Sequence, residues 1–233
     1  MLARGSNYAV EEMTNLEPEM RPLDDDQAWY VAMRWQQLDG EYRANYLRIL
    51  SVVGFYLVHL VQHYRPWGWL DDGLPVSGGF HLAMTVIAAV WLLMAFAIDL
   101  SLRQHLFPKG MMYLTTGMDL TLLTAAVCLG NGQASPLVLG YLLIIVMSGM
   151  RVSLPLVRCA MCSALFAYLF LMTIGKWPEL MGGRQIETIP RYAQLMTLLA
   201  IGITGIIVGQ LICRFRMLAD YYAARRVGGR PDE

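Results

Sequence analysis

Histidine and cysteine side chains occur in this 233-residue chain at spacings that suit ligation chemistry. His59 and His63 lie one helical turn apart, and His81 opens a later apolar run. Two helices that offer imidazoles at one depth could bind haem or a metal ion, but histidines at helix ends also commonly hydrogen-bond to loops. Cys159 and Cys162 form a CxxC pair, a spacing typical of metal and redox motifs. Which chemistry applies depends on the elements that hold these residues.

The composition of the chain indicates what those elements are. The chain is 56% hydrophobic and only 15% charged, and its mean hydropathy is +0.43. The charges crowd into residues 1–48, 99–109 and 214–233 and into two further connectors, and the long stretches between these regions carry almost none. A bilayer crossing needs about 20 apolar residues. The sequence therefore predicts an all-α fold, a polytopic integral membrane bundle.

Six transmembrane helices are expected, at about 46–62, 80–98, 112–129, 136–150, 154–174 and 193–212. The fourth is short for a full crossing, and only three residues separate it from the fifth. One long helix is the alternative, but Gly149 and Pro155 favour a tight turn, since proline is tolerated in a first helical turn. Before the bundle we expect a disordered acidic tail over residues 1–23. An amphipathic helix over 24–45 follows, either interfacial or packed on the bundle. A basic helical tail covers residues 213–233.

Lysine and arginine near the span ends predict the orientation. If both termini face the cytoplasm, the inner side carries the larger set, namely Arg34, Arg43, Arg48, Arg103, Lys109, Arg151, Arg214, Arg216, Arg225 and Arg226. The outer side carries Arg65, Lys176, Arg184 and Arg191. The loop GNGQASPL over residues 130–137 then faces outward. Because the first 44 residues are polar, we expect the first span to direct insertion without a cleavable signal.

Inside a membrane the CxxC thiols would sit in apolar surroundings that raise their pKa and quiet them, so packing is the simpler interpretation. Asp119 and Arg158 are stronger candidates for a functional role, because an ionisable residue within a span is energetically costly unless it faces a partner or water. Their similar depths from the cytoplasmic side predict an intramembrane ion pair. Asp99 is a competing partner for Arg158. A static strut that orients helices is the alternative to a functional role.

Two features of the last helix suggest close packing. Gly202, Gly205 and Gly209 include a GxxxG pattern that allows two backbones to approach, either within the bundle or in a dimer. Beyond the bilayer, Phe215, Leu218 and Tyr222 form an apolar stripe at helical spacing. We expect this stripe to pack on a partner chain or on a second copy of this chain, or to fold back onto residues 24–45.

Residues 113–172 resemble the membrane-embedded sensor regions of bacterial histidine kinases of the redox-responsive and pilus-regulating types. Those regions have six spans and an outward loop of the form GGxxNPF. Gly132 and Pro136 match this loop, whereas Asn131, Ser135 and Leu137 replace a glycine, an asparagine and a phenylalanine. In the redox-responsive family this loop is implicated in sensing quinone. Gly130 and Gly132 permit a positive φ in a tight turn and Pro136 can start the next helix, so these residues alone fit a simple reversal of the chain. The additional Asn131, Gln133 and Ser135 leave room for an outer-face binding loop, formed by Asn131, Gly132, Gln133, Ser135 and Pro136.

The sequence lacks the common signatures of catalysis. It contains no phosphate-binding glycine loop, nucleophile elbow or HExxH motif, no basic aromatic-rich patch for nucleic acid, and no kinase segment after Leu211. We therefore expect a non-catalytic sensor in the bacterial inner membrane that passes a bundle rearrangement to a cytoplasmic partner. An accessory subunit of a larger membrane complex is the alternative, and a small transporter is a third. The expected partners are the lipid bilayer and a protein bound by the tail, or a homo-oligomer. No cofactor is expected beyond quinone at the outer loop.

Overall fold

The computed structural model describes residues 25–64, 78–104, 110–130, 132–174 and 189–228, and all of its elements in these ranges are helical. In chain order they are α2 (Asp25–Tyr64), α3 (Gly78–Arg103), α4 (Met111–Leu129), η2 (Gly132–Ala134), η3 (Pro136–Leu139), α5 (Gly140–Met150), α6 (Leu154–Ile174) and α7 (Arg191–Gly228). The predicted all-α fold is confirmed for these ranges. The tail predicted over residues 1–23 lies outside them.

Within the described ranges, five helices are long and apolar enough to cross a membrane, as expected of a multi-pass membrane protein. They cover Asp39–Tyr64, Gly78–Arg103, Met111–Leu129, Leu154–Ile174 and Arg191–Ala219. The remaining apolar helix, Pro136–Met150, is shorter. At 1.5 Å per residue it reaches roughly 22 Å, less than the bilayer's hydrocarbon core of about 30 Å. The fourth predicted crossing, over residues 136–150, therefore exists as a helix but falls short of a full span.

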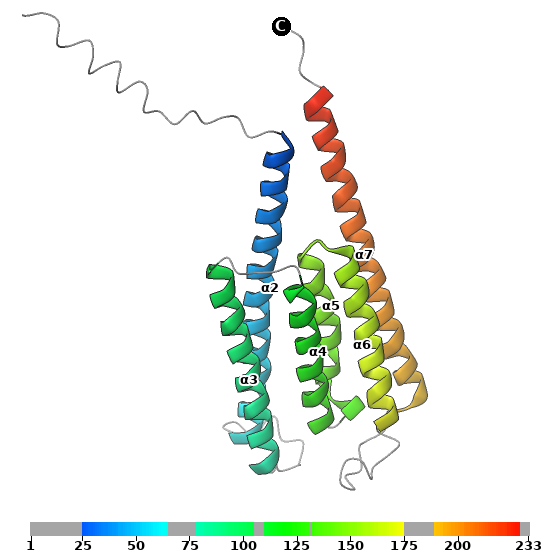
Figure 1. The fold of residues 1–233 in the computed structure, drawn as a ribbon. Helices are drawn as coiled ribbons and strands as arrows, with labels where there is room; N and C mark the ends of the chain where they lie inside the picture. Colours follow the sequence, from blue (N-terminus) through cyan, green and yellow to red (C-terminus); the bar gives the residue numbers. More distant parts are fainter. Residues whose placement is uncertain (1–24, 65–77, 105–109, 131, 175–188, 229–233) are drawn as a thin grey trace, which may run out of the picture. The chain divides into compact units, whose positions relative to one another are not determined.

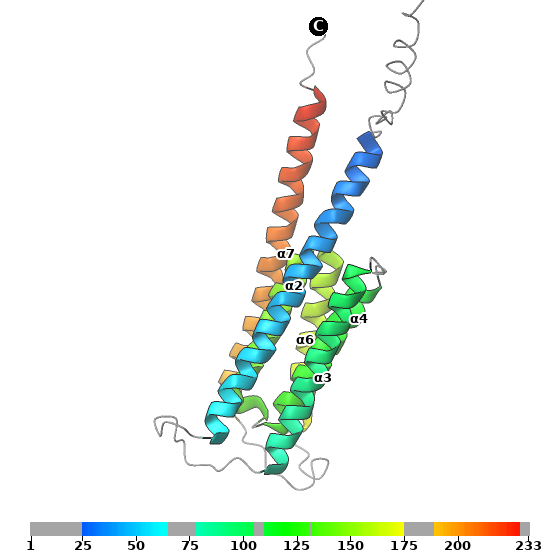
Figure 2. The ribbon, with the colours of Figure 1, turned by 90° about the vertical axis from the view of Figure 1, so that its left-hand side faces the viewer.

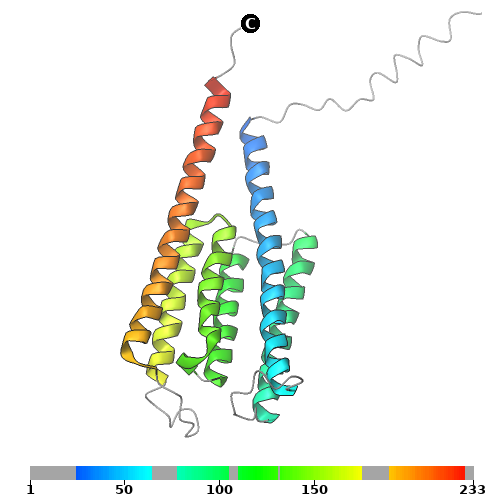
Figure 3. The same ribbon diagram turned by 180° about the vertical axis from the view of Figure 1, so that it is seen from behind.

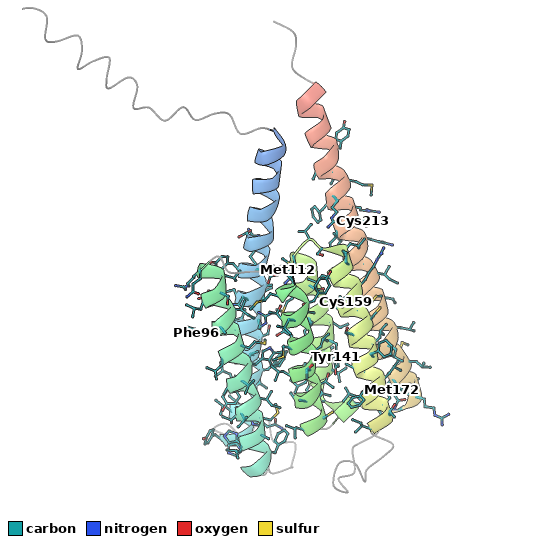
Figure 4. All side chains as sticks on the ribbon, viewed as in Figure 1. Phe96, Met112, Tyr141, Cys159, Met172 and Cys213 are labelled. Carbon is teal, nitrogen blue, oxygen red and sulfur yellow. The ribbon has the colours of Figure 1, made fainter. Side chains whose placement is uncertain are left out.

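The chain divides into two compact units, Met1–Gln36 and Gln37–Glu233. In the second unit the helices run alternately up and down, with α4, α5, α6 and α7 packed on one another and α3 on α4 (Figures 1 and 2). From Gln37 onward, α2 lies beside α3 (Figure 3). The core is apolar and includes Leu123, Val127, Tyr141, Ile145, Tyr168 and Ile201. Figure 4 shows Tyr141 among α4, α5 and α6.

Helix boundaries follow the local sequence. Ser135 caps η3, because its Oγ accepts a hydrogen bond from the backbone N–H of Leu137 at 3.3 Å, and Pro136 occupies the first helical position. α5 and α6 are separate helices joined by a tight turn at Arg151 and Val152, as Pro155 predicts.

The first span begins earlier than the sequence suggested. Gly40, Glu41, Ala44 and Asn45 are buried, so the bundle includes residues before the boundary predicted at residue 46. The segment predicted as a separate amphipathic helix over residues 24–45 has no boundary of its own from Asp25 onward. It is continuous with the first span in α2.

Candidate functional site

A buried ion pair joins α2 to α4. Arg48 Nε lies 2.8 Å from Asp119 Oδ1 and 3.0 Å from Oδ2, and Arg48 Nη2 lies 2.7 Å from Oδ2. Trp91 of α3 donates a further hydrogen bond from Nε1 to Asp119 Oδ1 at 2.8 Å. The side chains of Arg48 and Asp119 are 1% and 4% exposed. This two-point geometry is the strong form of an arginine–carboxylate contact.

Asn45 extends the pair to a third helix. Its Oδ1 accepts a hydrogen bond from Arg48 Nη1 at 2.7 Å, and its Nδ2 donates to the backbone oxygen of Ala95 at 3.0 Å. Asn45 therefore uses both ends of its amide, one toward the guanidinium and one toward α3. The network of Arg48, Asp119, Trp91 and Asn45 thus connects α2, α3 and α4. We call it the Arg48 network.

A second buried arginine occupies the turn between α5 and α6. Arg151 Nη1 donates to the backbone oxygen of Met112 at 3.0 Å and to Thr116 Oγ1 at 2.7 Å, and Nη2 donates to Thr115 Oγ1 at 3.2 Å. Its Nε lies 2.8 Å from Glu41 Oε1 in an ion pair whose side chains are 2% and 1% exposed. We call this set the Arg151 network.

Burial lowers the pKa of Arg151 from its usual value, and the attraction of the Glu41 carboxylate opposes that effect. Arginine titrates so far above neutrality that the guanidinium stays charged at physiological pH. Arg151 therefore acts as a fixed cation that holds the turn against α2 and α4.

The α5–α6 turn also contacts two further elements closely. Gly40 of α2 packs against it so tightly that a Cβ there would lie 2.8 Å from the backbone oxygen of Met150. Val152 has a positive φ of 49°, a left-handed conformation that is strained for a β-branched residue. The Val152 backbone oxygen accepts a hydrogen bond from Arg216 Nη2 of α7 at 2.8 Å. The turn is therefore a junction of α2, α4 and α7.

The structure does not bring Asp119 and Arg158 together. Asp119 pairs with Arg48, while Arg158 is exposed on α6. The predicted partner of Asp119 is therefore wrong, since the arginine that pairs with it is Arg48 and not Arg158. The depth of a residue along its helix does not reveal which other helix packs beside it. A usable signal was present in the sequence. Glu41, Asn45 and Arg48 recur at four and three residues, which places all three polar side chains on one face of α2.

Residues of the predicted outer loop pack against other parts of the same chain. Gly132 has φ 61°, a left-handed conformation that favours glycine, whereas Gly130 has φ −76° and lacks the positive φ expected of it. Gln133 is buried, and its Oε1 accepts a hydrogen bond from Gln194 Nε2 of α7 at 2.7 Å. Ser135 is buried and caps η3. The side chains of Gln133 and Ser135 thus make contacts within the chain. Asn131 lies outside the described residues.

Two of the three predicted packing glycines of α7 contact α6. A Cβ on Gly205 would lie 2.4 Å from Met161 Sδ, and one on Gly209 would lie 3.5 Å from Leu154 Cδ1. A Cβ on Gly202 would meet nothing within 4 Å. The GxxxG of Gly205 and Gly209 therefore serves packing inside the bundle.

The histidines gather at one end of α2 and α3. His59 Nε2 lies 3.2 Å from His81 Nδ1, and the rings of His63 and His81 stack with centroids 4.0 Å apart. Cys159 and Cys162 are free and exposed on α6. In the described part of the chain, no group of three or more histidine, cysteine, aspartate or glutamate side chains is placed to hold a metal ion.

Comparisons with protein-family models, with characterised proteins and with solved structures found no match. The resemblance of residues 113–172 to sensor regions rests on the sequence alone.

The two arginine networks act by positioning helices. Their charged groups are buried and directed at partners in other elements, and losing one member of a buried pair strands the other in a low dielectric. Together they fix α2 against α3, α4 and the α5–α6 turn.

Proposed function

We propose that this chain is a non-catalytic sensor or signalling module of the bacterial inner membrane. It crosses the membrane six times with both termini in the cytoplasm, and it passes a rearrangement of the bundle to a cytoplasmic partner through α7. The excess of arginine at the ends of α3 and α7 and at the α5–α6 turn supports this orientation. A sixth crossing is feasible because Gly132, Gln133 and Ser135 of the loop before α5 are buried in protein, where non-helical backbone is tolerated at membrane depth.

One observation carries the proposal. α7 is a single helix of 38 residues from Arg191 to Gly228, roughly 57 Å long at 1.5 Å per residue. Near its start, Gln194 holds Gln133 of the outer loop. Further along, Arg216 holds the α5–α6 turn through Val152. A continuous helix that contacts the loop at one side of the membrane and the junction at the other is a suitable relay between them.

The end of α7 offers a contact surface on the cytoplasmic side. The helix continues past the ends of α3 to α6 (Figure 1). Phe215, Met217 and Leu218 are more than half exposed there. Arg214 and Arg216 flank these apolar side chains and suit anionic headgroups nearby. Because Arg214 and Arg216 place this segment at the headgroups and not among the acyl chains, we take a protein partner as the cover for its apolar side chains, and the segment is the proposed output surface.

A second candidate function has an observation of its own. Large apolar side chains are exposed along α3, including Leu82, Leu93 and Phe96, as well as on α7. Lipid covers such side chains in a bilayer, but so would the neighbouring subunits of a larger complex. The alternative is therefore an accessory subunit of a membrane protein complex.

Site-specific photo-crosslinking in native membranes distinguishes the two. A photoreactive amino acid at Leu218 probes the proposed output surface, and one at Leu93 of α3 is the matched control on a lipid-facing helix. The sensor proposal predicts adducts with a soluble cytoplasmic protein at Leu218 and none at Leu93. Adducts with integral membrane proteins at both positions would support the complex-subunit alternative and contradict the sensor proposal.

A further inference from the structure

The outward face of α7 carries a regular stripe of exposed side chains. The members are Tyr192, Met196, Leu199, Ile203, Ile206, Gln210, Cys213 and Met217, and their spacing alternates between four and three residues throughout. All are exposed except Cys213, which is half-buried. This 3.5-residue repeat is the pattern by which two helices pair along their length. Its next position holds Asp220, where the apolar repeat ends.

The stripe lies on the side of α7 that faces away from its own bundle. The inward face is formed by a different set, Ile201, Gly205, Val208 and Ile212, of which Ile201 and Ile212 are buried. A Cβ on Gly205 would contact Met161 of α6, and Val208 packs against Gly149 of α5. Packing within the chain therefore leaves the outward stripe unused.

Gln210 separates this stripe from an ordinary lipid-facing surface. It lies six residues before Arg216, within the candidate span Arg191–Ala219, and it is exposed. The described residues offer its amide no hydrogen-bond partner. A polar side chain that faces lipid is unfavourable, and transmembrane helices relieve this by bonding across an interface.

A second copy of this chain fits that requirement. A carboxamide is both donor and acceptor, so two Gln210 side chains at the same depth can hydrogen-bond to each other. Copies inserted with one orientation present α7 in parallel, which brings equal depths together across a two-fold axis. Beside the stripe, Gly202 and Leu165 line a groove of about 410 Å³ between α6 and α7, open to bulky side chains from a partner.

We propose that two copies of this chain pair in parallel through α7, with the stripe from Tyr192 to Met217 as the seam and Gln210 as its polar centre. A polar residue at one seam position sets the register of paired helices. The pairing requires no output role for α7, and a dimer without signalling would satisfy it equally.

Cys213 makes the seam testable with a native residue. Figure 4 shows it on α7 beyond the middle of the helix. With Cys128, Cys159 and Cys162 replaced by alanine, oxidation in membranes should link Cys213 to Cys213 and give a covalent dimer. The matched control carries Cys213→Ala and Leu211→Cys, because Leu211 is exposed two residues away but lies off the seam. It should give little dimer.

The equilibrium between monomer and dimer supplies an independent measurement that needs no cysteine. Gln210→Leu should lower the dimerisation constant measured by energy transfer in liposomes by roughly 3- to 20-fold, the value of one interhelical hydrogen bond in a membrane. Gln62→Leu, at an exposed glutamine of α2, should leave it unchanged. A monomer in liposomes, equal cross-linking at Leu211, or a cross-link from Cys213 to a different polypeptide would overturn the proposal.

Discussion

Replacing Asp119 with asparagine tests whether the Arg48 network holds the bundle together. The substitution keeps the shape of the side chain but removes the charge that Arg48 contacts at 2.7 to 3.0 Å. The guanidinium then stays buried without the carboxylate that it pairs with. Loss of one partner of a buried pair costs about 3–5 kcal/mol, so Asp119→Asn and Arg48→Gln should each destabilise the protein by about this amount.

The double variant gives the sharper result. Once both charges are absent, no buried charge is stranded, so the loss for Asp119→Asn with Arg48→Gln should fall clearly below the sum of the two single losses. Unfolding free energies can be measured in mixed micelles with a graded denaturing detergent. The control is Arg158→Gln, which removes an exposed arginine and should change stability by less than about 0.5 kcal/mol. Additive single losses, or a large loss for Arg158→Gln, would refute this account of the pair.

Other expectations follow from the same structure. Gly40→Ala should destabilise the bundle, since the new Cβ would press on a backbone oxygen, whereas Gly54→Ala in the same helix meets open space and should be neutral or stabilising by up to about 1 kcal/mol in the same unfolding assay. Arg151→Lys should destabilise by about 1–3 kcal/mol in that assay, because an ammonium cannot reproduce the guanidinium contacts to α4 and to Glu41 of α2 and leaves buried acceptors unsatisfied. Reporter fusions should be active on the outer side after Lys176 and on the cytoplasmic side after Gly228. Reversed activities would reject the proposed orientation.

The helices were predictable because their signals are local. Long uncharged runs set α3 to α7, and Pro136 and Pro155 mark where η3 and α6 begin. The residue at which the bundle begins was harder to predict, because Glu41 and Asn45 look like surface residues in the sequence. They are buried only because partners on other helices accept them.

The partners of the charged residues could not be derived in the same way. The sequence indicates the depth of each charge along its helix, but it does not show that α2 forms ion pairs with both α4 and the α5–α6 turn. Arg48 and Arg151 therefore counted only as orientation signals, although both are buried in networks. The contact between Gln133 and Gln194 likewise joins residues 61 apart and depends on how α7 packs.

The central claim is that a change at the outer loop reaches the cytoplasmic end of α7. Its most direct test is the rate at which a single cysteine at position 218 reacts with a maleimide in inverted membrane vesicles. Gln194→Ala breaks the contact with Gln133, and Gln62→Ala is the control at an exposed glutamine. The account predicts a changed rate at position 218 for Gln194→Ala and an unchanged rate for Gln62→Ala. An unchanged rate for Gln194→Ala in a folded protein would contradict it.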